Sequence, residues 1–362
     1  RHNVYLDIIF IIILLAISML ISSIDMKITY KLFGFVVLLS ILWGISLLLE
    51  RLSLPLPPVI CTSLGLIIAT GIGTYISGKR QRKYRQFITS AFSQYMSPEL
   101  LKELKENPEK LRLGGERKEI TLIFTDIAGF TSTSEALNPE VLVENLNLYL
   151  EGMVEIILRY DGVIDKFIGD AIMATFNAPN DCPDHSSRAV MCALELDQFA
   201  KKFRENCRQK DVEWGLTRIG VHSNPAIVGN IGGAERFEYT SIGDTVNITA
   251  RLEGINKLFG TSICVSATTA NKCSSLNFMP IGELILKGKT EPIQVLTPKK
   301  EETELSKLYI EAYNFLREGN NHRARDMFKN ILELDENDVL SKFHLNRLVS
   351  GESGVLIRAL EK

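Results

Sequence analysis

The sequence lacks a strong net charge, and it also lacks the cysteine spacing of a zinc site. Its 362 residues carry a net charge of −2, which gives no general basis for binding nucleic acid, since that needs a basic surface. The six cysteines show no paired C-x-x-C spacing. Most of them lie in the C-terminal part, where we expect reduced thiols rather than disulfides.

Charged residues are almost absent from three long apolar runs near the N-terminus. These runs extend from Val4 to about Ile24, from Tyr30 to Leu49 and from Leu54 to Ile76. Each has about the length that crosses a bilayer. Buried core helices are also apolar, but three such runs in succession do not suit a soluble domain. We therefore predict three transmembrane helices within residues 1–77.

Basic residues predict how these helices are oriented. Five of the seven residues in Lys79–Arg85 are basic, and the positive-inside rule places such a cluster in the cytoplasm. Three crossings then put Arg1 outside and the loop with Lys27 and Lys31 inside. The first run lacks the basic flank and cleavage site of a signal peptide. We expect a multi-pass protein of the cell membrane with an extracytoplasmic N-terminus and a cytoplasmic C-terminal part.

The segment after the third run contains one misleading motif and then a predicted linker. Gly73–Lys79 has the spacing G-x-x-x-x-G-K of a phosphate-binding loop, but Arg80 follows instead of Ser or Thr. We reject this motif because it ends an apolar helix. Residues 78–115 are predicted to form amphipathic helices, and Ser97-Pro98-Glu99 is typical of a helix start. A solvated linker and a coupling element that pairs with a second subunit both remain open.

Two β-rich segments each carry an aspartate beside a turn. Thr121–Phe124 is predicted to be a buried strand that ends near Asp126. Val163–Ile168 and Ala171–Phe176 are predicted to form a hairpin with Gly169-Asp170 at its turn. Carboxylates at strand ends can converge on a hard cation such as Mg²⁺. Each aspartate alone would be an ordinary turn residue.

The surrounding pattern alternates strands with helices. Helices are predicted over Pro139–Tyr160 and Arg188–Cys207, and a further strand over Leu216–Val221. This order favours an α+β fold with a mixed or antiparallel sheet.

Further polar residues at fixed spacing give the chain a family resemblance. Lys166 precedes Asp170 by four residues, and the segment RFEYTSIGDTVNITARLEG places three polar residues at intervals of seven and four: Thr240, Asn247 and Arg251. With these motifs in this order, Glu116 to Leu296 resembles the class III nucleotide cyclases, which make cyclic AMP or cyclic GMP. The resemblance implies a ferredoxin-like catalytic domain over residues 116–298.

The resemblance also implies roles for the acidic and helical residues. Two Mg²⁺ or Mn²⁺ ions per active site would be held by Asp126, by Asp170 and by the backbone carbonyl of Ile127. Such ions lower the charge cost when the ribose 3′-oxygen attacks the α-phosphorus and pyrophosphate leaves. Arg251 suits the negative charge that develops on the α-phosphate. Asn247, one helical turn away, can orient the ribose.

Base and outer phosphates would be met by three other side chains. Lys166 can only donate hydrogen bonds, which matches adenine N1 and opposes guanine N1, and Thr240 can accept from the adenine amino group. Guanylyl cyclases that resemble this family carry an acid at the position of Lys166, so we expect ATP rather than GTP. Threonine in place of the commoner aspartate resembles the subgroup that includes bicarbonate-responsive cyclases. Lys287 is expected to meet the outer phosphates, although Lys289 competes and either lysine could be a solvated surface residue.

The shared sites of similar cyclases imply a homodimer. In that family the metal ligands of one subunit face the base-binding residues of the other, and this chain has both sets in one domain. One departure is Asn224, in a loop where the family usually has glycine. We expect His222, and the cluster Asp181, Cys182, Asp184 and His185, to be structural.

The C-terminal residues 299–362 are predicted to be helical. Leu308–Leu348 resembles one tetratricopeptide repeat and the start of another. Packing on the catalytic domain, pairing in the dimer and binding a protein partner all remain open.

We conclude from the sequence that the chain is a membrane-anchored adenylyl cyclase. A guanylyl cyclase, or a non-catalytic receptor or scaffold with a cyclase-like domain, is the alternative. Similar cyclases often carry an extracytoplasmic sensor. Because this chain begins with Arg rather than Met, we expect one to precede it.

Overall fold

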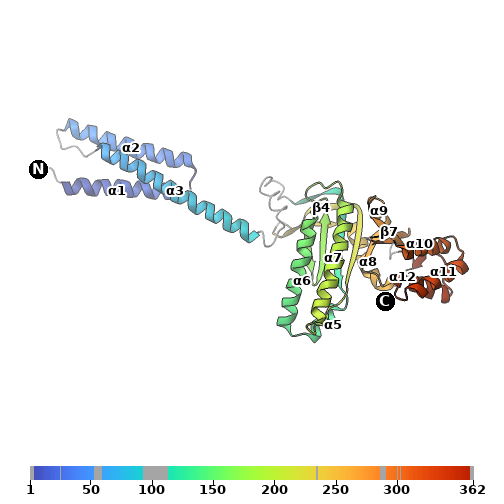
Figure 1. Ribbon diagram of the computed structural model, residues 1–362. Coiled ribbons are helices and arrows are strands. Elements are labelled where there is room, and N and C mark those ends of the chain that lie inside the picture. The colour runs from blue at the N-terminus through green and yellow to red at the C-terminus, as the bar shows by residue number, and fades with distance from the viewer. Residues whose placement is uncertain are drawn as a thin grey trace. The chain divides into compact units, whose positions relative to one another are not determined.

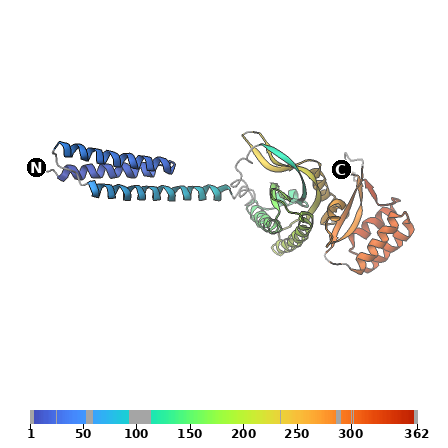
Figure 2. The ribbon, with the colours of Figure 1, turned by 90° about the horizontal axis from the view of Figure 1, so that it is seen from above.

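The structure is a computed structural model that describes residues 4–24, 26–52, 59–92, 113–233, 235–285, 291–299, 301 and 303–358. The chain divides into two compact units, Arg1–Met96 and Ser97–Lys362. Figures 1 and 2 show the first unit in blue as a helical bundle and the second as a sheet with helices. Each unit is described separately.

In its described residues the first unit contains three helices that lie side by side (Figures 1 and 2): α1 (Val4–Ser23), α2 (Ile28–Arg51) and α3 (Val59–Phe92). A few apolar side chains fill its interior, among them Leu42 and Leu66. Most of the others face outward; Leu20, for example, is 66% exposed. A soluble protein rarely exposes so continuous an apolar surface.

Two of the three helices have the length and apolar composition needed to cross a membrane, over Ile28–Arg51 and Val59–Tyr84, while the apolar stretch Ile8–Ser23 is shorter. The structure therefore supports two of the three predicted spans by length and composition. Residues 54–58 of the third predicted run lie outside the described residues. Helix α3 continues to Phe92, so the rejected Gly73–Lys79 motif and the basic segment after it are parts of one helix.

The second unit begins with a four-stranded arrangement in the order β2-β3-β1-β4. Its strands, all antiparallel to their neighbours, are β1 (Gly114–Ile127), β2 (Val163–Ile168), β3 (Ala171–Phe176) and β4 (Thr217–Gly232). Helices α6 (Pro139–Arg159) and α7 (His185–Arg208) lie together on one face (Figure 1). This β-α-β-β-α-β order is the ferredoxin-like arrangement that the resemblance implied.

Alternating side chains of the central strand β1 serve the two faces of the sheet. Ile123 packs in the core beneath α6 and α7, whereas Ile120 and Leu122 belong to a cluster on the other side. This period of two is what an interior strand requires. The short helix α5 (Phe130–Ala136) follows β1 and was not predicted.

The sheet continues beyond β4 with both parallel and antiparallel pairs. The added strands are β5 (Phe237–Ile242) on β4, and then β6 (Ile263–Ser266), β8 (Ile293–Lys299), β7 (Asn277–Ile285) and β9 (Leu356–Arg358). The pairs β4–β6 and β7–β9 are parallel, so the predicted mixed sheet is confirmed. The short helix α9 (Ala267–Ala270) follows β6.

The prediction of a loop around Asn224 is wrong. Asn224 lies inside β4 and pairs with Ile120 of β1. Asn224 is not one of the described residues that have a positive φ. Because the backbone is extended there, neither glycine nor a left-handed conformation is needed.

The C-terminal helices pack on the sheet domain, which settles one of the roles left open. These helices are α10 (Glu304–Arg317), α11 (Asn321–Leu334) and α12 (Val339–Val349). Phe343 of α12 meets Phe259 of α8 (Asp244–Phe259) edge to face, with ring centroids 5.0 Å apart. The hydroxyl of Tyr309 donates to the carbonyl of Pro280 in β7 at 2.8 Å. The tail and α8 therefore share one apolar core.

Candidate active site

The first group of candidate residues lies where β1 ends. Asp126 is the penultimate residue of β1, and Asp170 follows Gly169 at the turn of the β2–β3 hairpin. Gly169 has φ of +65°, a left-handed conformation that glycine adopts easily. Because β3 pairs with β1, this turn lies beside the end of β1, and the backbone N–H of Ile127 donates to Asp170 Oδ2 at 3.0 Å. The structure thus brings Asp126, Ile127 and Asp170 together.

Two charged residues that the sequence analysis missed complete this group. Arg218 lies opposite Asp126 in the β1–β4 register, and its Nη2 is 2.5 Å from Asp126 Oδ2. Its Nε is 3.1 Å from Oε1 of Glu253 on α8. That second contact is an ion pair without the geometry of a hydrogen bond. Strand register sets the first contact and the packing of α8 on β4 sets the second, so no local sequence signal marked either residue.

The carboxylates of this group are crowded in a partly buried place. Burial raises the pKa of Asp170, and the charge of Asp126 adds to that rise, while the N–H of Ile127 opposes it. Burial also raises the pKa of Glu253 to about 7, with the charges of Asp126 and then Asp170 contributing, although Arg218 lowers it. Converging carboxylates with raised pKa values indicate that positive charge would be favourable there.

The donor set fits a hard divalent cation that keeps open positions. Among the described residues, no three side chains of His, Cys, Asp or Glu form a complete metal cage. Mg²⁺ is commonly held by one or two carboxylates and completed by waters and phosphate oxygens. Asp126 and Asp170 supply such a pair, and the backbone of Ile127 adjoins them.

The second group of candidate residues joins β2 to β5. The hydroxyl of Thr240 donates to both oxygens of Asp165, at 2.8 and 2.9 Å, and the N–H of Ser241 donates to Asp165 Oδ2 at 3.0 Å. Lys166 Nζ lies 2.6 Å from Glu238 Oε2 and 3.5 Å from Asp165 Oδ1. Lys166 and Thr240 are therefore brought together, with Asp165 between them.

The sequence analysis missed Asp165 because the alternation of side chains along a regular strand predicts that it points away from the site of Lys166. Neighbouring side chains of a regular strand point to opposite faces, so Asp165 and Lys166 should diverge. The β2–β3 register shifts between Ile164 and Lys166, and such a bulge re-aims side chains. Both residues thereby reach β5, and the side chain of Asp165 is only 3% exposed.

Charge within this second group is balanced by hydrogen bonds. Burial raises the pKa of Asp165, and the hydrogen bonds from Thr240 and Ser241 partly offset that rise. Burial opposes the charge of Lys166, but the hydrogen bond to Glu238 and the charge of Asp165 outweigh it and raise the pKa of Lys166. Lys166 therefore remains a cation and a pure hydrogen-bond donor at neutral pH.

Helix α8 carries the third group, Asn247 and Arg251. The helix packs closely on β4 at Gly220, where an added Cβ would come within 2.4 Å of the Thr249 carbonyl oxygen. Its buried face leaves Asn247 exposed and Arg251 half-buried, one helical turn apart. Lys287 and Lys289 lie outside the described residues.

The first two groups are held by separate sets of contacts. Asp126 and Asp170 have their partners around Arg218, and Lys166 and Thr240 have theirs around Asp165. In the described part of the chain, no hydrogen bond or ion pair joins the first group to the second.

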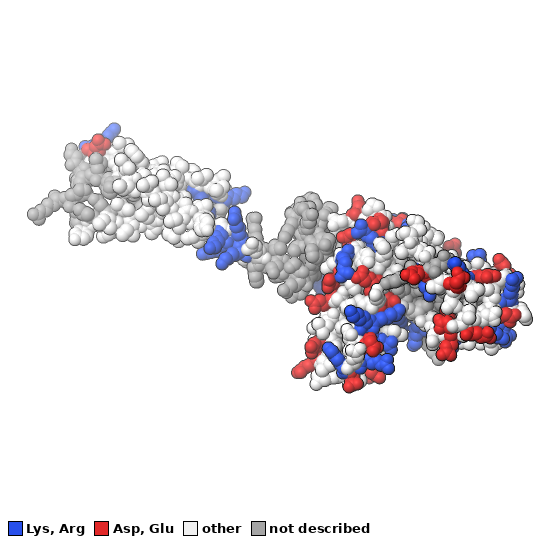
Figure 3. Space-filling model, in the orientation of Figure 1, with Lys and Arg blue, Asp and Glu red and all other residues white. Residues whose placement is uncertain are grey.

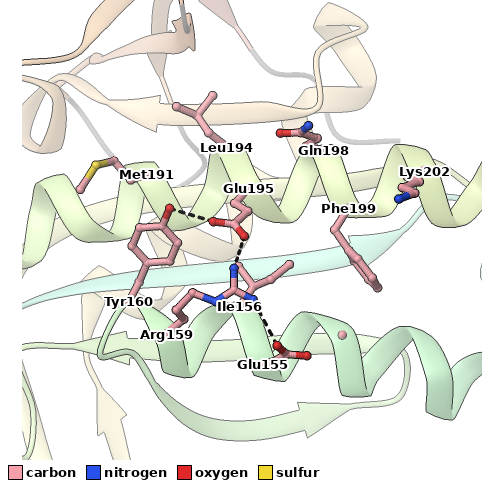
Figure 4. A pocket seen from close by; sticks show the side chains of 11 residues that line it. Glu155, Ile156, Arg159, Tyr160, Met191, Leu194, Glu195, Gln198, Phe199 and Lys202 are labelled. Atoms are coloured by element: carbon pink, nitrogen blue, oxygen red, sulfur yellow. Dashed lines mark hydrogen bonds and ion pairs between the residues drawn. The ribbon is translucent and has the colours of Figure 1, made fainter.

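A pocket between α6 and α7 contains none of the candidate residues (Figure 4). Several of its polar side chains bind one another, since Glu195 accepts from Tyr160 at 2.8 Å and also pairs with Arg159. Arg159 in turn lies 3.2 Å from Glu155. This network links the two helices, and we assign it a structural role.

The residues expected to be structural have such contacts. His222 Nδ1 lies 2.7 Å from Ser266 Oγ in the interior. In the predicted loop cluster, Asp181 pairs with Lys118 at 2.6 Å. His185 is hydrogen-bonded to Thr121 at 2.6 Å. Asp184 occupies the N-cap position of α7, but its side chain pairs with Arg188 instead of capping the helix. All six cysteines are free thiols, as expected.

Comparison with known proteins gives consistent matches to this unit. The family model for the adenylate and guanylate cyclase catalytic domain matches residues 115–299. Adenylate cyclase 1 of Rhizobium meliloti (strain 1021) is 36% identical over 208 residues, which are 56% of this chain and 31% of that protein. Adenylate cyclase of Anabaena cylindrica is 32% identical over 225 residues, 60% of this chain and 42% of that protein. The chain thus spans less than half the length of these curated relatives.

A solved structure shares the fold. The structure of a bacterial light-regulated adenylyl cyclase matches with a TM-score of 0.53 and 24% identity, covering 65% of this chain and 67% of that one. At this identity the likeness concerns the fold alone.

The first group generates a testable expectation about cations. Millimolar Mg²⁺ or Mn²⁺ should raise the melting temperature of the chain, because a ligand that binds only the folded state stabilises it. Asp126→Asn and Asp170→Asn should abolish this rise, whereas Asp181→Asn, at an exposed position, should keep it. The rise should be smaller at pH 5 than at pH 7.5, since the raised pKa of Asp170 lets protons compete with the cation. Equal shifts in all variants by scanning fluorimetry would contradict the assignment.

Proposed function

The chain belongs to the adenylate and guanylate cyclase catalytic domain family, and from that premise we propose that it is an adenylyl cyclase. It converts ATP to 3′,5′-cyclic AMP and pyrophosphate. The observation that carries the choice of nucleotide is the hydrogen bond from Thr240 to the buried carboxylate of Asp165, next to Lys166.

This hydrogen bond determines which residue of the base-binding pair, Lys166 and Thr240, donates a hydrogen bond to the base and which accepts one. A hydroxyl has one proton to donate, and Thr240 gives its proton to Asp165, so its oxygen lone pairs remain to accept. Lys166 can only donate. Adenine offers an acceptor at N1 and a donor at its amino group, which complements this pair, whereas guanine offers the reverse. A mismatched pair would leave buried polar groups unsatisfied, at a cost of about 1–3 kcal/mol.

The remaining residues supply binding and charge at the reacting phosphates. Asp126, Asp170 and the carbonyl of Ile127 would hold Mg²⁺ or Mn²⁺, two ions per site, which lower the charge cost at the attacking and leaving oxygens. Arg251 faces the charge that develops on the α-phosphate, and Asn247 orients the ribose. Lys287, beyond the described residues, is our proposal for the outer phosphates.

Arg218 supplies a positive charge beside the acidic residues. Its ion pair with Asp126 neutralises that carboxylate. A metal bound to Asp126 would weaken this pair, and the guanidinium would then be available to a phosphate oxygen.

A second copy of the chain completes each site. The base-binding pair and the acidic pair lie in separate groups of one chain, and each lacks the other half. Apolar side chains beside them are exposed, namely Phe167 at 50% and Ile168 at 51% on the β2–β3 hairpin, and Ile242 at 41% at the end of β5. A two-fold homodimer would cover such surfaces and form two equivalent sites.

The helical bundle anchors the enzyme in the membrane. Its outward apolar surface suits lipid, and its basic end suits the cytoplasmic side. We propose a multi-pass topology with three crossings, an extracytoplasmic N-terminus and a cytoplasmic catalytic domain. The α10–α12 tail packs against α8 within the same unit. The outer surface of the tail is available to a protein partner.

Nucleotide turnover tests the proposed reaction. The cytoplasmic part, residues 79–362, and the full chain in lipid are supplied with ATP or GTP and with Mg²⁺ or Mn²⁺. Cyclic AMP should dominate, and Asp126→Ala should lower its formation by at least about 100-fold because the charge of the transition state loses its support. Dominant cyclic GMP would contradict the roles of Lys166 and Thr240. No product from either protein would favour a scaffold.

The role of Asp165 is tested by nucleotide discrimination. Without Asp165 the hydroxyl of Thr240 can rotate and donate, so Asp165→Ala should lower the ratio of kcat/KM for ATP to that for GTP by about 10-fold, the value of one hydrogen bond. Glu238→Ala removes the other carboxylate beside Lys166 but leaves Thr240 untouched, and it should keep the ratio. Equal losses with both nucleotides would show that Asp165 is merely structural.

Mixing two inactive variants tests the shared sites. Asp170→Ala and Arg251→Ala each disable both sites of their own homodimer, but a heterodimer retains one intact site. Random pairing of equal amounts should therefore restore about a quarter of wild-type turnover. Co-purification with two affinity tags verifies that heterodimers form, and absence of recovery in that fraction would refute the shared-site arrangement.

A further inference from the structure

A pocket in the helical bundle lies outside the proposed catalytic site. It measures about 510 Å³ and is formed by Met26 and Lys27, the start of α2 and the α3 segment around Ser77. Its polar lining includes Lys27, Lys31, Thr74 and Gln81. The catalytic chemistry proposed above uses none of these residues.

Lys31 is a buried cation at this pocket. The residue is 6% exposed, and its Nζ donates to the carbonyl oxygen of Ser22 at 2.8 Å and to Ser77 Oγ at 2.9 Å. An ammonium group has three protons, and these two bonds use two of them. Among the residues that the structure describes, no carboxylate forms an ion pair with Lys31. A buried charge is costly unless it is paired and fully hydrogen-bonded, which favours an anionic ligand at the pocket.

The surroundings of the pocket are strongly basic. Segment 79–85 of α3 carries five basic residues, and Lys27 and Lys31 add two more, against one nearby acid in the sequence, Asp25. Figure 3 shows Lys and Arg gathered at one end of the bundle, next to a long uncharged surface. Asp25 lies outside the described residues, and one acid leaves this end positively charged.

The rim of the pocket points to a ligand that is part polar and part apolar. Met26 and Ile28 also line it, and they are 45% and 63% exposed. A free anion would gain nothing from these side chains. A phospholipid would place its phosphate near Lys31 and its acyl chains along the apolar helices. Basic pockets between membrane helices on the cytoplasmic side suit anionic head groups.

We infer that this pocket binds the phosphate head group of an anionic phospholipid. The inference rests on the proposed membrane position of the bundle and is independent of the nucleotide chemistry. Lys31 is the central ligand, with Lys27 as a second cation and Ser77 holding the Lys31 ammonium in place.

Lipid retention by the full chain tests this inference. Protein in detergent is mixed with phosphatidylglycerol or phosphatidylcholine, and bound lipids are counted by native mass spectrometry. One phosphatidylglycerol should be retained in preference to phosphatidylcholine. Lys31→Gln should weaken its binding by at least about fivefold, since one lysine is worth about 1 kcal/mol with anionic lipid. Lys31→Arg keeps the charge and should retain the lipid.

A matched control separates the pocket from general surface charge. Lys79→Gln removes one exposed charge from the same end of the bundle and two residues from Ser77, outside the pocket, and it should bind lipid as the wild type does. Equal weakening by Lys79→Gln and Lys31→Gln would overturn the inference, as would equal retention of the two lipids by the wild type. Full displacement by millimolar inorganic phosphate would assign the pocket to a soluble anion instead.

A negative result in the lipid experiment can be distinguished from a failure of the proposed cyclase function. Lipid retention is measured without nucleotide, and turnover is also measured on residues 79–362, which lack Lys27, Lys31 and Ser77 of the pocket. Alkaline extraction of cell membranes tests separately whether the bundle is inserted. A chain released by alkali would remove the premise of lipid binding and leave the cyclase assignment intact.

Discussion

The pairing of the long strand β4 with its neighbours is the constraint on which the candidate site depends. Its pairing with β1 puts Arg218 against Asp126, and its far half holds β5, which carries Thr240. Helix α8 packs onto the same strand at Gly220, where no side chain fits. One strand thus positions a member of each functional group, and distortion of β4 would disturb all of them together.

The two charged groups of the site differ in how they are balanced. Around Asp126 three carboxylates meet one guanidinium, and burial together with the neighbouring negative charges raises the pKa values of Asp170 and Glu253. Around Asp165 the hydroxyl, amide and ammonium donors satisfy the acid. The first group is suited to bind additional positive charge. The second is already ordered by hydrogen bonds and is suited to distinguish bases by their pattern of hydrogen-bond donors and acceptors.

The C-terminal helices extend the core that supports the catalytic helix. Phe343 of α12 packs on Phe259 at the end of α8, and the guanidinium of Arg347 donates to the carbonyls of Gly354 and Leu356, which fastens β9 to the tail. A displacement of this tail would therefore act on the helix that carries Asn247 and Arg251. The repeat-like pattern of the tail does not require a second repeat, because the sheet domain buries its apolar face.

The sequence by itself determined the elements and the grouping of several site residues. β-rich apolar runs beside turn residues located the β2–β3 hairpin, and the family resemblance grouped Asn247 with Arg251. Tertiary structure alone decided the rest. Strand register placed Arg218 at the acids, and the packing of α8 on β4 placed Glu253 there. A bulge turned Asp165 toward Thr240, and β4 continues through the predicted loop at Asn224. The contacts of Thr240 with Asp165 and of Arg218 with Asp126 join residues 75 and 92 positions apart in the chain. Local patterns carry no information about register between distant strands.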